Sequence, residues 1–74
     1  MTKSFCVIKN FKYSDNIDRI IQKTIKKIKH KLYIRKYQYN IQKTKYNFAI
    51  KGTIDIVSNT AYNKFIEELE KIGY

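Results

Sequence analysis

The sequence predicts a small α+β domain in which two helices pack on one face of a mostly antiparallel sheet. In two segments apolar residues recur every three or four positions, which is typical of helices with one buried face. Between them apolar residues recur at every second position, which is typical of half-buried strands. The chain has 74 residues, no proline and no internal repeat, so residues 1–74 are expected to form a single domain.

The first two elements are a strand and a long helix. Residues 4–11 are rich in Phe, Val and Ile and lead into a polar segment, so they are expected to form a strand. Ser14 and Asp15 are both suitable N-caps for a helix from about residue 15 to residue 32. At about 1.5 Å per residue this helix is roughly 27 Å long and must cross the sheet. Its apolar sector is expected in the core and consists of Ile17, Ile20, Ile21, Ile25, Ile28 and Leu32.

Two or three strands follow. Apolar and polar residues alternate through residues 37–42 and again through residues 46–50, so these segments are expected to pair as a hairpin. Gly52 is suited to a tight turn with positive φ. In that case residues 54–57 form a further strand and the element order is β-α-β-β-β-α. If residues 46–57 are one continuous strand, the order is β-α-β-β-α.

The last element is an amphipathic helix. Ser58, Asn59 and Thr60 supply its N-cap, and Gly73 is suited to its end. The apolar stripe expected to face the sheet consists of Ala61, Tyr62, Phe65, Ile66, Leu69 and Ile72.

The chain is strongly basic, and its charge is uneven. Sixteen Lys and Arg against six Asp and Glu give a formal net charge of +10. Residues 1–51 carry fourteen Lys and Arg against two Asp, a net +12, whereas residues 52–74 carry two Lys against four acidic residues, a net −2. A polyanionic partner would relieve this self-repulsion, so nucleic acid is the first candidate. Codon bias in an AT-rich coding sequence is the alternative source of part of the lysine excess.

Basic residues occupy the sector of the first helix opposite its apolar stripe, and they continue at the ends of the next strands. Like charges about 5–6 Å apart along a helix repel one another, and no glutamate intervenes here. An ordinary solvated lysine face is the alternative interpretation. We predict that nucleic-acid phosphates contact Arg19, Lys23, Lys26, Lys27, Lys29, His30, Arg35, Lys36, Lys43 and Lys45.

No combination of residues indicates catalysis. His30 has no carboxylate nearby in sequence and no suitably spaced nucleophile, so it is expected to face solvent or contact a phosphate. Asp15 and Asp18 lie one turn apart, but acidic residues in a first helical turn are explained by the helix dipole. Cys6 lies among apolar residues and is expected to be buried. We therefore expect a non-enzymatic protein with no cofactor, no metal site and no small-molecule substrate.

The remaining patterns concern the tyrosines and the cellular location. Tyr37, Tyr39 and Tyr46 alternate as core residues do, whereas a base-stacking platform needs an uncovered sheet face.

The apolar run before Lys9 is too short for a signal peptide or a membrane span. The apolar sector of the basic helix is expected to pack against the sheet, so it is not available to insert into a membrane. We expect a cytoplasmic protein with no membrane partner, and no pattern indicates its oligomeric state.

Three segments resemble segments of a known family. Residues 9–17 (KNFKYSDNI) look like its strand exit and capped helix start, residues 20–28 are similar to its first helix, and residues 61–71 are similar to its second. The family is that of the ribosome hibernation-promoting factors, which the chain resembles over nearly its whole length. The order β-α-β-β-β-α is also that family's order.

The resemblance implies binding in the decoding region of the small ribosomal subunit. The rRNA contacts of the first helix would then come from Lys23, Lys26, Lys27 and His30. The sequence departs from the family in its shorter hairpin, in the lack of a basic tail, and in the acidic residues of the second helix, which are Glu67, Glu68 and Glu70.

The leading hypothesis is a non-catalytic protein that binds structured RNA, most concretely a ribosome-binding silencer of translation. One alternative is a small viral, phage or mobile-element protein that binds DNA or inhibits a host protein. Another is a structural component of a nucleoprotein assembly.

Overall fold

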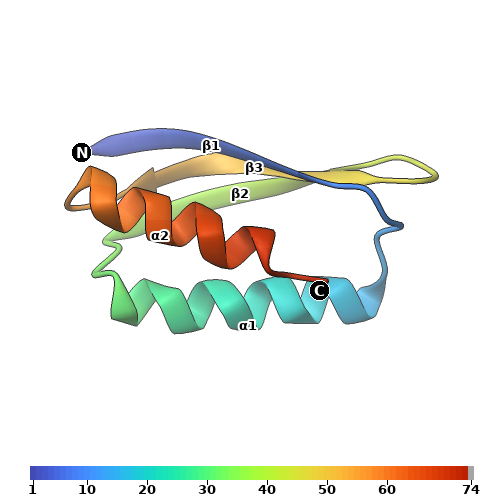
Figure 1. The fold of residues 1–74 in the computed structure, drawn as a ribbon, viewed down its shortest axis with the longest axis horizontal. Helices are drawn as coiled ribbons and strands as arrows, with labels where there is room; N and C mark the ends of the chain where they lie inside the picture. Colours follow the sequence, from blue (N-terminus) through green and yellow to red (C-terminus); the bar gives the residue numbers. More distant parts are fainter. Residues whose placement is uncertain (74) are drawn as a thin grey trace.

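The computed structural model describes residues 1–73 and has the element order β-α-β-β-α (Figure 1). The elements are β1 (Thr2–Lys9), α1 (Asp15–Lys31), β2 (Lys36–Lys43), β3 (Phe48–Asp55) and α2 (Asn59–Glu70). The predicted α+β class is confirmed. Of the two element orders, the one with a continuous third strand is correct, and the order with six elements is wrong.

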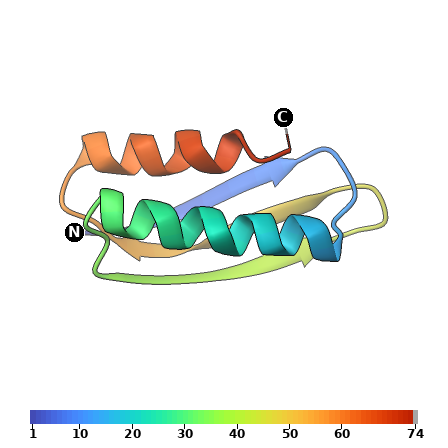
Figure 2. The same ribbon diagram turned by 90° about the horizontal axis from the view of Figure 1, so that it is seen from below.

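The three strands form one antiparallel sheet in the order β1-β3-β2, so the last strand of the chain lies in the middle. Phe5 of β1 and Tyr39 of β2 both lie opposite Gly52 of β3. β1 and β2 are therefore parallel to each other, and α1 makes the connection between them, which is a split β-α-β unit. Both helices lie on the same face of the sheet, as Figures 1 and 2 show from two directions.

Gly52 does not form the turn that the sequence suggests. It lies within β3, and its φ is not in the left-handed region. An added Cβ would lie 2.7 Å from the Cα of Tyr39 and still closer to the carbonyl oxygen of Gln38. Glycine is therefore needed here because the backbone of β2 passes close to it, which is a second common reason for glycine within a strand.

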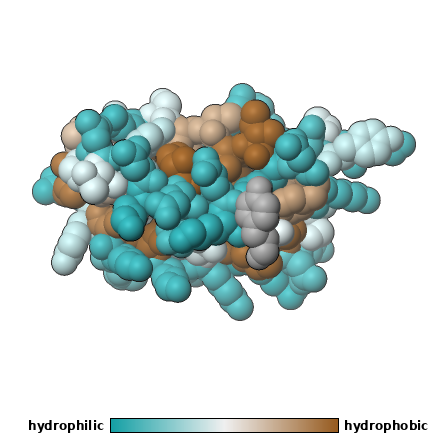
Figure 3. Space-filling model, viewed as in Figure 1, coloured by the Kyte–Doolittle hydropathy of each residue, from teal (hydrophilic) through white to brown (hydrophobic). Residues whose placement is uncertain are grey.

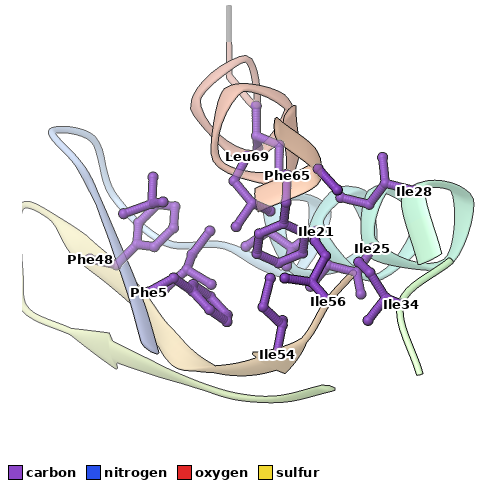
Figure 4. Close-up of a cluster of buried hydrophobic side chains, with 14 residues drawn as sticks. Phe5, Ile21, Ile25, Ile28, Ile34, Phe48, Ile54, Ile56, Phe65 and Leu69 are labelled. Carbon is purple, nitrogen blue, oxygen red and sulfur yellow. The ribbon is translucent and has the colours of Figure 1, made fainter. Parts of the chain in front are cut away.

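The core lies between the sheet and the two helices (Figure 4). The rings of Phe5 on β1 and Phe65 on α2 meet edge to face, with centroids 4.9 Å apart. Ile20 is an exception to the predicted core, because it lies at the margin of the apolar sector and is 43% exposed. The core side chains that are less than 2% exposed are Phe48, Phe65, Ile21, Ile25, Ile28, Ile50, Ile54, Ile56 and Leu69.

The expectations for Cys6 and Tyr46 are wrong. Phe5 and Val7 point to the helices, so Cys6 between them faces the other side of the sheet and is exposed rather than buried. Tyr37 and Tyr39 are partly buried against the core, as predicted. Tyr46 is 74% exposed, because β3 begins only at residue 48 and leaves this tyrosine in the hairpin loop.

Both helices begin at the serine that the sequence indicates. Ser14 Oγ accepts a hydrogen bond from the Ile17 backbone N–H at 3.3 Å, and Ser58 Oγ accepts one from Ala61 at 3.1 Å. These bonds satisfy backbone donors that have no partner within the helix. The first helix therefore starts at a position fixed by local sequence.

The C-terminus of α1 has a less common feature. The Leu32 N–H donates to Ile28 O at 2.9 Å, and the Ile34 N–H donates to Lys29 O at 3.0 Å. The second bond spans six residues and defines a Schellman motif, which requires a left-handed residue just after the helix cap. That residue is Tyr33, with φ of 55°. Glycine is usual there, because the left-handed conformation strains a residue with a side chain by roughly 1–2 kcal/mol.

Lys9 connects β1 to the end of α2. Its side chain is on the helix side of the sheet, only 5% of the residue is exposed, and its Nζ donates to the carbonyl oxygen of Glu70. Burial lowers the pKa of this ammonium, and the charge of the Glu70 carboxylate opposes that effect. A cation at a helix C-terminus satisfies a free carbonyl and interacts favourably with the helix dipole.

Candidate nucleic-acid interface

The outer face of α1 carries half of the predicted binding residues. Because Ile21, Ile25 and Ile28 face the core, the positions opposite them face solvent. We refer to this surface as the α1 ridge, and it consists of the exposed residues Arg19, Lys23, Lys26, Lys27 and His30. In Figure 3 hydrophilic side chains project along the lower margin, where Figure 1 places α1.

The cations of the ridge are not neutralised by carboxylates. Within residues 1–73, the ion pairs are those of Lys71 with Glu67 and Glu68, each at 3.7 Å, and of the N-terminal amine with Asp55 at 3.2 Å. None of them includes a ridge residue. The ridge therefore presents unpaired positive charge to solvent, which is the requirement for an electrostatic contact with phosphates.

Charge also varies along α1. The first turn holds two acidic residues, and Asp18 accepts hydrogen bonds from Tyr13 Oη and from Gln22 Nε2, the latter at 2.8 Å. Burial raises the pKa of Tyr13 to about 12, and Asp18 adds to this effect. By contrast, residues 26–36 contain six Lys and Arg, one His and no acidic residue. Basic residues are therefore most concentrated around the C-terminal end of α1.

Lys29 does not belong to the ridge, although the sequence places it there. Its side chain turns toward β2, is partly buried, and puts Nζ 5.4 Å from the centroid of the Tyr37 ring. This is a cation–π contact within the fold.

Arg35 and Lys36 lie at the same end of the molecule as His30. Arg35 and His30 are exposed and line one shallow hollow, so Arg35 extends the ridge around the end of the domain. Its backbone N–H donates to Asp55 O at 3.2 Å, which fixes it to β3. Lys36 alternates with the inward-facing Tyr37, so its side chain lies on the uncovered sheet face, away from the ridge.

Lys43 and Lys45 lie at the other end of the domain. β2 has eight residues and advances about 3.3 Å per residue, so its two ends are roughly 23 Å apart. Lys43 Nζ lies 5.2 Å from the centroid of the Tyr13 ring, and Lys45 Nζ lies 5.9 Å from that of Tyr46. The ten predicted residues therefore do not all lie on the surface that carries His30 and Arg35.

The uncovered face of the sheet is mostly polar and lacks a stacking platform. Sheet-based RNA-binding modules stack bases on exposed aromatic side chains. The strand residues on this face are Thr2, Ser4, Cys6, Ile8, Lys36, Gln38, Asn40, Gln42, Ala49, Lys51, Thr53 and Asp55, none of which is aromatic.

Two residues at the basic end are not among the predicted ones. Lys31 is exposed in the last turn of α1 and belongs to the same basic run. Tyr33 is 77% exposed just beyond that turn. A helix commonly ends with a glycine in the left-handed conformation, and no glycine follows α1 in the sequence before β2. The lack of glycine was the sequence signal that a residue with a side chain takes this position.

In residues 1–73 no three His, Cys, Asp or Glu side chains are grouped so that they could hold a metal ion. No described helix is both long and apolar enough to span a membrane.

No protein-family model, curated protein or solved structure matches this chain. The observed order of five elements also differs from the six-element order of the hibernation-promoting factors, so element order gives that resemblance no support.

Proposed function

We propose that this protein is a non-catalytic RNA-binding protein that contacts phosphates through the α1 ridge and Arg35. The observation that carries the proposal is the run of six Lys and Arg and one His in residues 26–36, with no acidic residue among them. Four exposed side chains of this run are on α1, whose inner face is in the core, and they are Lys26, Lys27, His30 and Lys31.

The dimensions of the ridge are compatible with a phosphate backbone. From Arg19 to His30 the helix advances roughly 17 Å at about 1.5 Å per residue. A nucleic-acid strand advances about 3.4 Å per nucleotide, so the ridge extends along about five nucleotides. Such contacts supply affinity and orientation but little sequence information. We therefore propose recognition of RNA by charge and shape rather than by sequence.

The finer form of the proposal is a silencer of translation that binds the small ribosomal subunit. Its support is the sequence resemblance of residues 9–17, 20–28 and 61–71 to the hibernation-promoting factors. The ribosome is consequently the first RNA target to test, and duplex DNA is the comparison that separates this proposal from the mobile-element alternative.

The experiment compares the wild type with a triple variant, Lys23→Glu, Lys26→Glu and Lys27→Glu, in co-sedimentation with ribosomal subunits and in retention on duplex DNA. All three side chains are exposed, so the fold should persist, as checked by circular dichroism. We expect the wild type to sediment with the subunits and the variant to lose at least about tenfold in affinity, because three contacts become repulsive.

The matched control replaces three charges on the other helix, with Glu67→Gln, Glu68→Gln and Glu70→Gln. Binding should then be unchanged or slightly stronger. Retention on duplex DNA without ribosome binding would favour the alternative function. Equal binding by the wild type and the ridge variant would place the interface on another face of the molecule.

A further inference from the structure

Tyr33 occupies a backbone position that the fold would assign to glycine. It is the one residue other than glycine with positive φ in residues 1–73, at 55°. The Schellman bond from Ile34 N–H to Lys29 O, at 3.0 Å, holds it in this left-handed conformation. Strained positions of this kind are concentrated at functional sites.

Packing does not account for the tyrosine. In a Schellman motif the apolar contact is usually made by the residue after the left-handed one. That residue is Ile34, which is 4% exposed and belongs to the core. Tyr33 is 77% exposed, so burial of its ring does little to offset the backbone strain.

The surroundings of the ring combine an apolar floor with positive charge. A shallow hollow at this end of the domain, open to solvent, is lined by Lys29, His30, Tyr33, Ile34, Arg35 and Val57. Val57 is 58% exposed and adds apolar surface from the connection between β3 and α2. An exposed aromatic ring beside basic side chains is the arrangement with which proteins bind unpaired nucleotides, because bases stack on the ring while cations contact the phosphates.

We propose that Tyr33 stacks an unpaired base of the bound RNA, with His30 and Arg35 contacting the adjacent phosphates. This inference depends on the proposed function, and it adds a substrate class to it: RNA with a single-stranded nucleotide next to the segment that lies along the α1 ridge. A base already paired within a duplex does not offer a free face to this ring.

The strain provides a test that separates stacking from a structural role. Tyr33→Gly removes the ring and also supplies the residue that the backbone prefers, so the variant should melt at a higher temperature than the wild type. If the ring stacks a base, the same variant should bind a short single-stranded oligouridine about 5- to 150-fold more weakly. Tyr33→Trp should retain binding.

Tyr46→Gly is the matched control, because Tyr46 is also exposed, has a lysine beside its ring and lies at the opposite end of the domain. It should leave oligouridine binding unchanged. Binding of a blunt RNA duplex should be within about twofold of the wild type for both variants. Retained oligouridine affinity in Tyr33→Gly, or an equal loss on single strand and duplex, would overturn the stacking proposal.

These outcomes are distinguishable from failure of the proposed function itself. If Tyr33→Gly binds as the wild type does while the triple ridge variant does not, RNA binding stands and stacking is wrong. If the wild type binds neither oligouridine nor duplex RNA, the proposed function is wrong, and the stacking proposal with it.

Discussion

The salt dependence of the proposed RNA binding would locate its interface when two equal charge changes are compared. The first variant combines Lys26→Gln and Lys27→Gln in the α1 ridge. The second combines Lys43→Gln and Lys45→Gln at the hairpin end. All four side chains are exposed, and each pair lowers the formal net charge from +10 to +8. An effect of overall charge would be the same in both variants, whereas an effect of a local interface would not.

The expected magnitude follows from the number of cations at the interface. The ridge and Arg35 provide five Lys and Arg, and each phosphate contact contributes about −0.7 to −0.9 to the slope of log affinity against log salt, for a total of roughly −3.5 to −4.5. Between about 50 and 200 mM salt the wild type should weaken about 130- to 500-fold. The ridge variant keeps three contacts, so it should weaken only about 20- to 40-fold over that range. The hairpin variant should follow the wild type.

Fluorescence anisotropy of a labelled RNA hairpin, measured over a series of KCl concentrations, gives these slopes directly. Circular dichroism checks that both variants are folded. Equal reductions of the slope in the two variants would refute a localised interface and indicate diffuse charge attraction. A wild-type affinity that does not change with salt would refute phosphate binding altogether and favour a protein partner.

Two other predictions concern the fold that holds the ridge. Gly52→Ala should lower the free energy of unfolding by about 3 kcal/mol in urea titrations, because the added Cβ displaces β2. As a control, Lys51→Ala on the exposed face should change the free energy of unfolding by no more than about 1 kcal/mol. A Gly52→Ala protein as stable as the wild type would contradict the close approach of the strands. Tyr13 has a pKa of about 12 in the fold against 10.0 in its absence, so the folded state holds more protons between these values and stability should fall as pH rises from 10 to 12. Urea midpoints across this range should decline less in Tyr13→Phe, and an unchanged decline would show that Tyr13 does not retain its proton.

The elements with strong local signals could be predicted from the sequence. α1 and α2 follow from apolar spacing and from Ser14 and Ser58, which cap them through bonds to nearby residues. The β2–β3 hairpin follows from alternation on both sides of a short polar segment. Gly52 was misinterpreted because a turn and a close strand approach both require glycine, and only the position of β2 distinguishes the two.

The candidate site was less predictable, because it depends on how the elements are placed. Arg19 and Lys23 are on the ridge because a helical period fixes which face is exposed. Lys29 is near the border of that face, and the position of Tyr37 on β2 decides that it turns inward. Lys43 is separated from His30 because β2 carries the chain to the far end of the domain, and the direction of a strand cannot be obtained from charge patterning.

The central position of β3 has a consequence for how the chain folds. β2 and β3 are joined by residues 44–47 and pair locally, whereas Thr2 of β1 pairs with Asp55 across 53 positions of sequence. Closing a loop over so long a separation costs chain entropy, which contacts formed earlier must compensate. Non-local pairings of this kind therefore slow folding. The hairpin with its adjacent helices is thus the expected nucleus, and β1 joins last. During synthesis β1 emerges before the other two strands, and its partner strand is complete only when residues 48–55 have followed it.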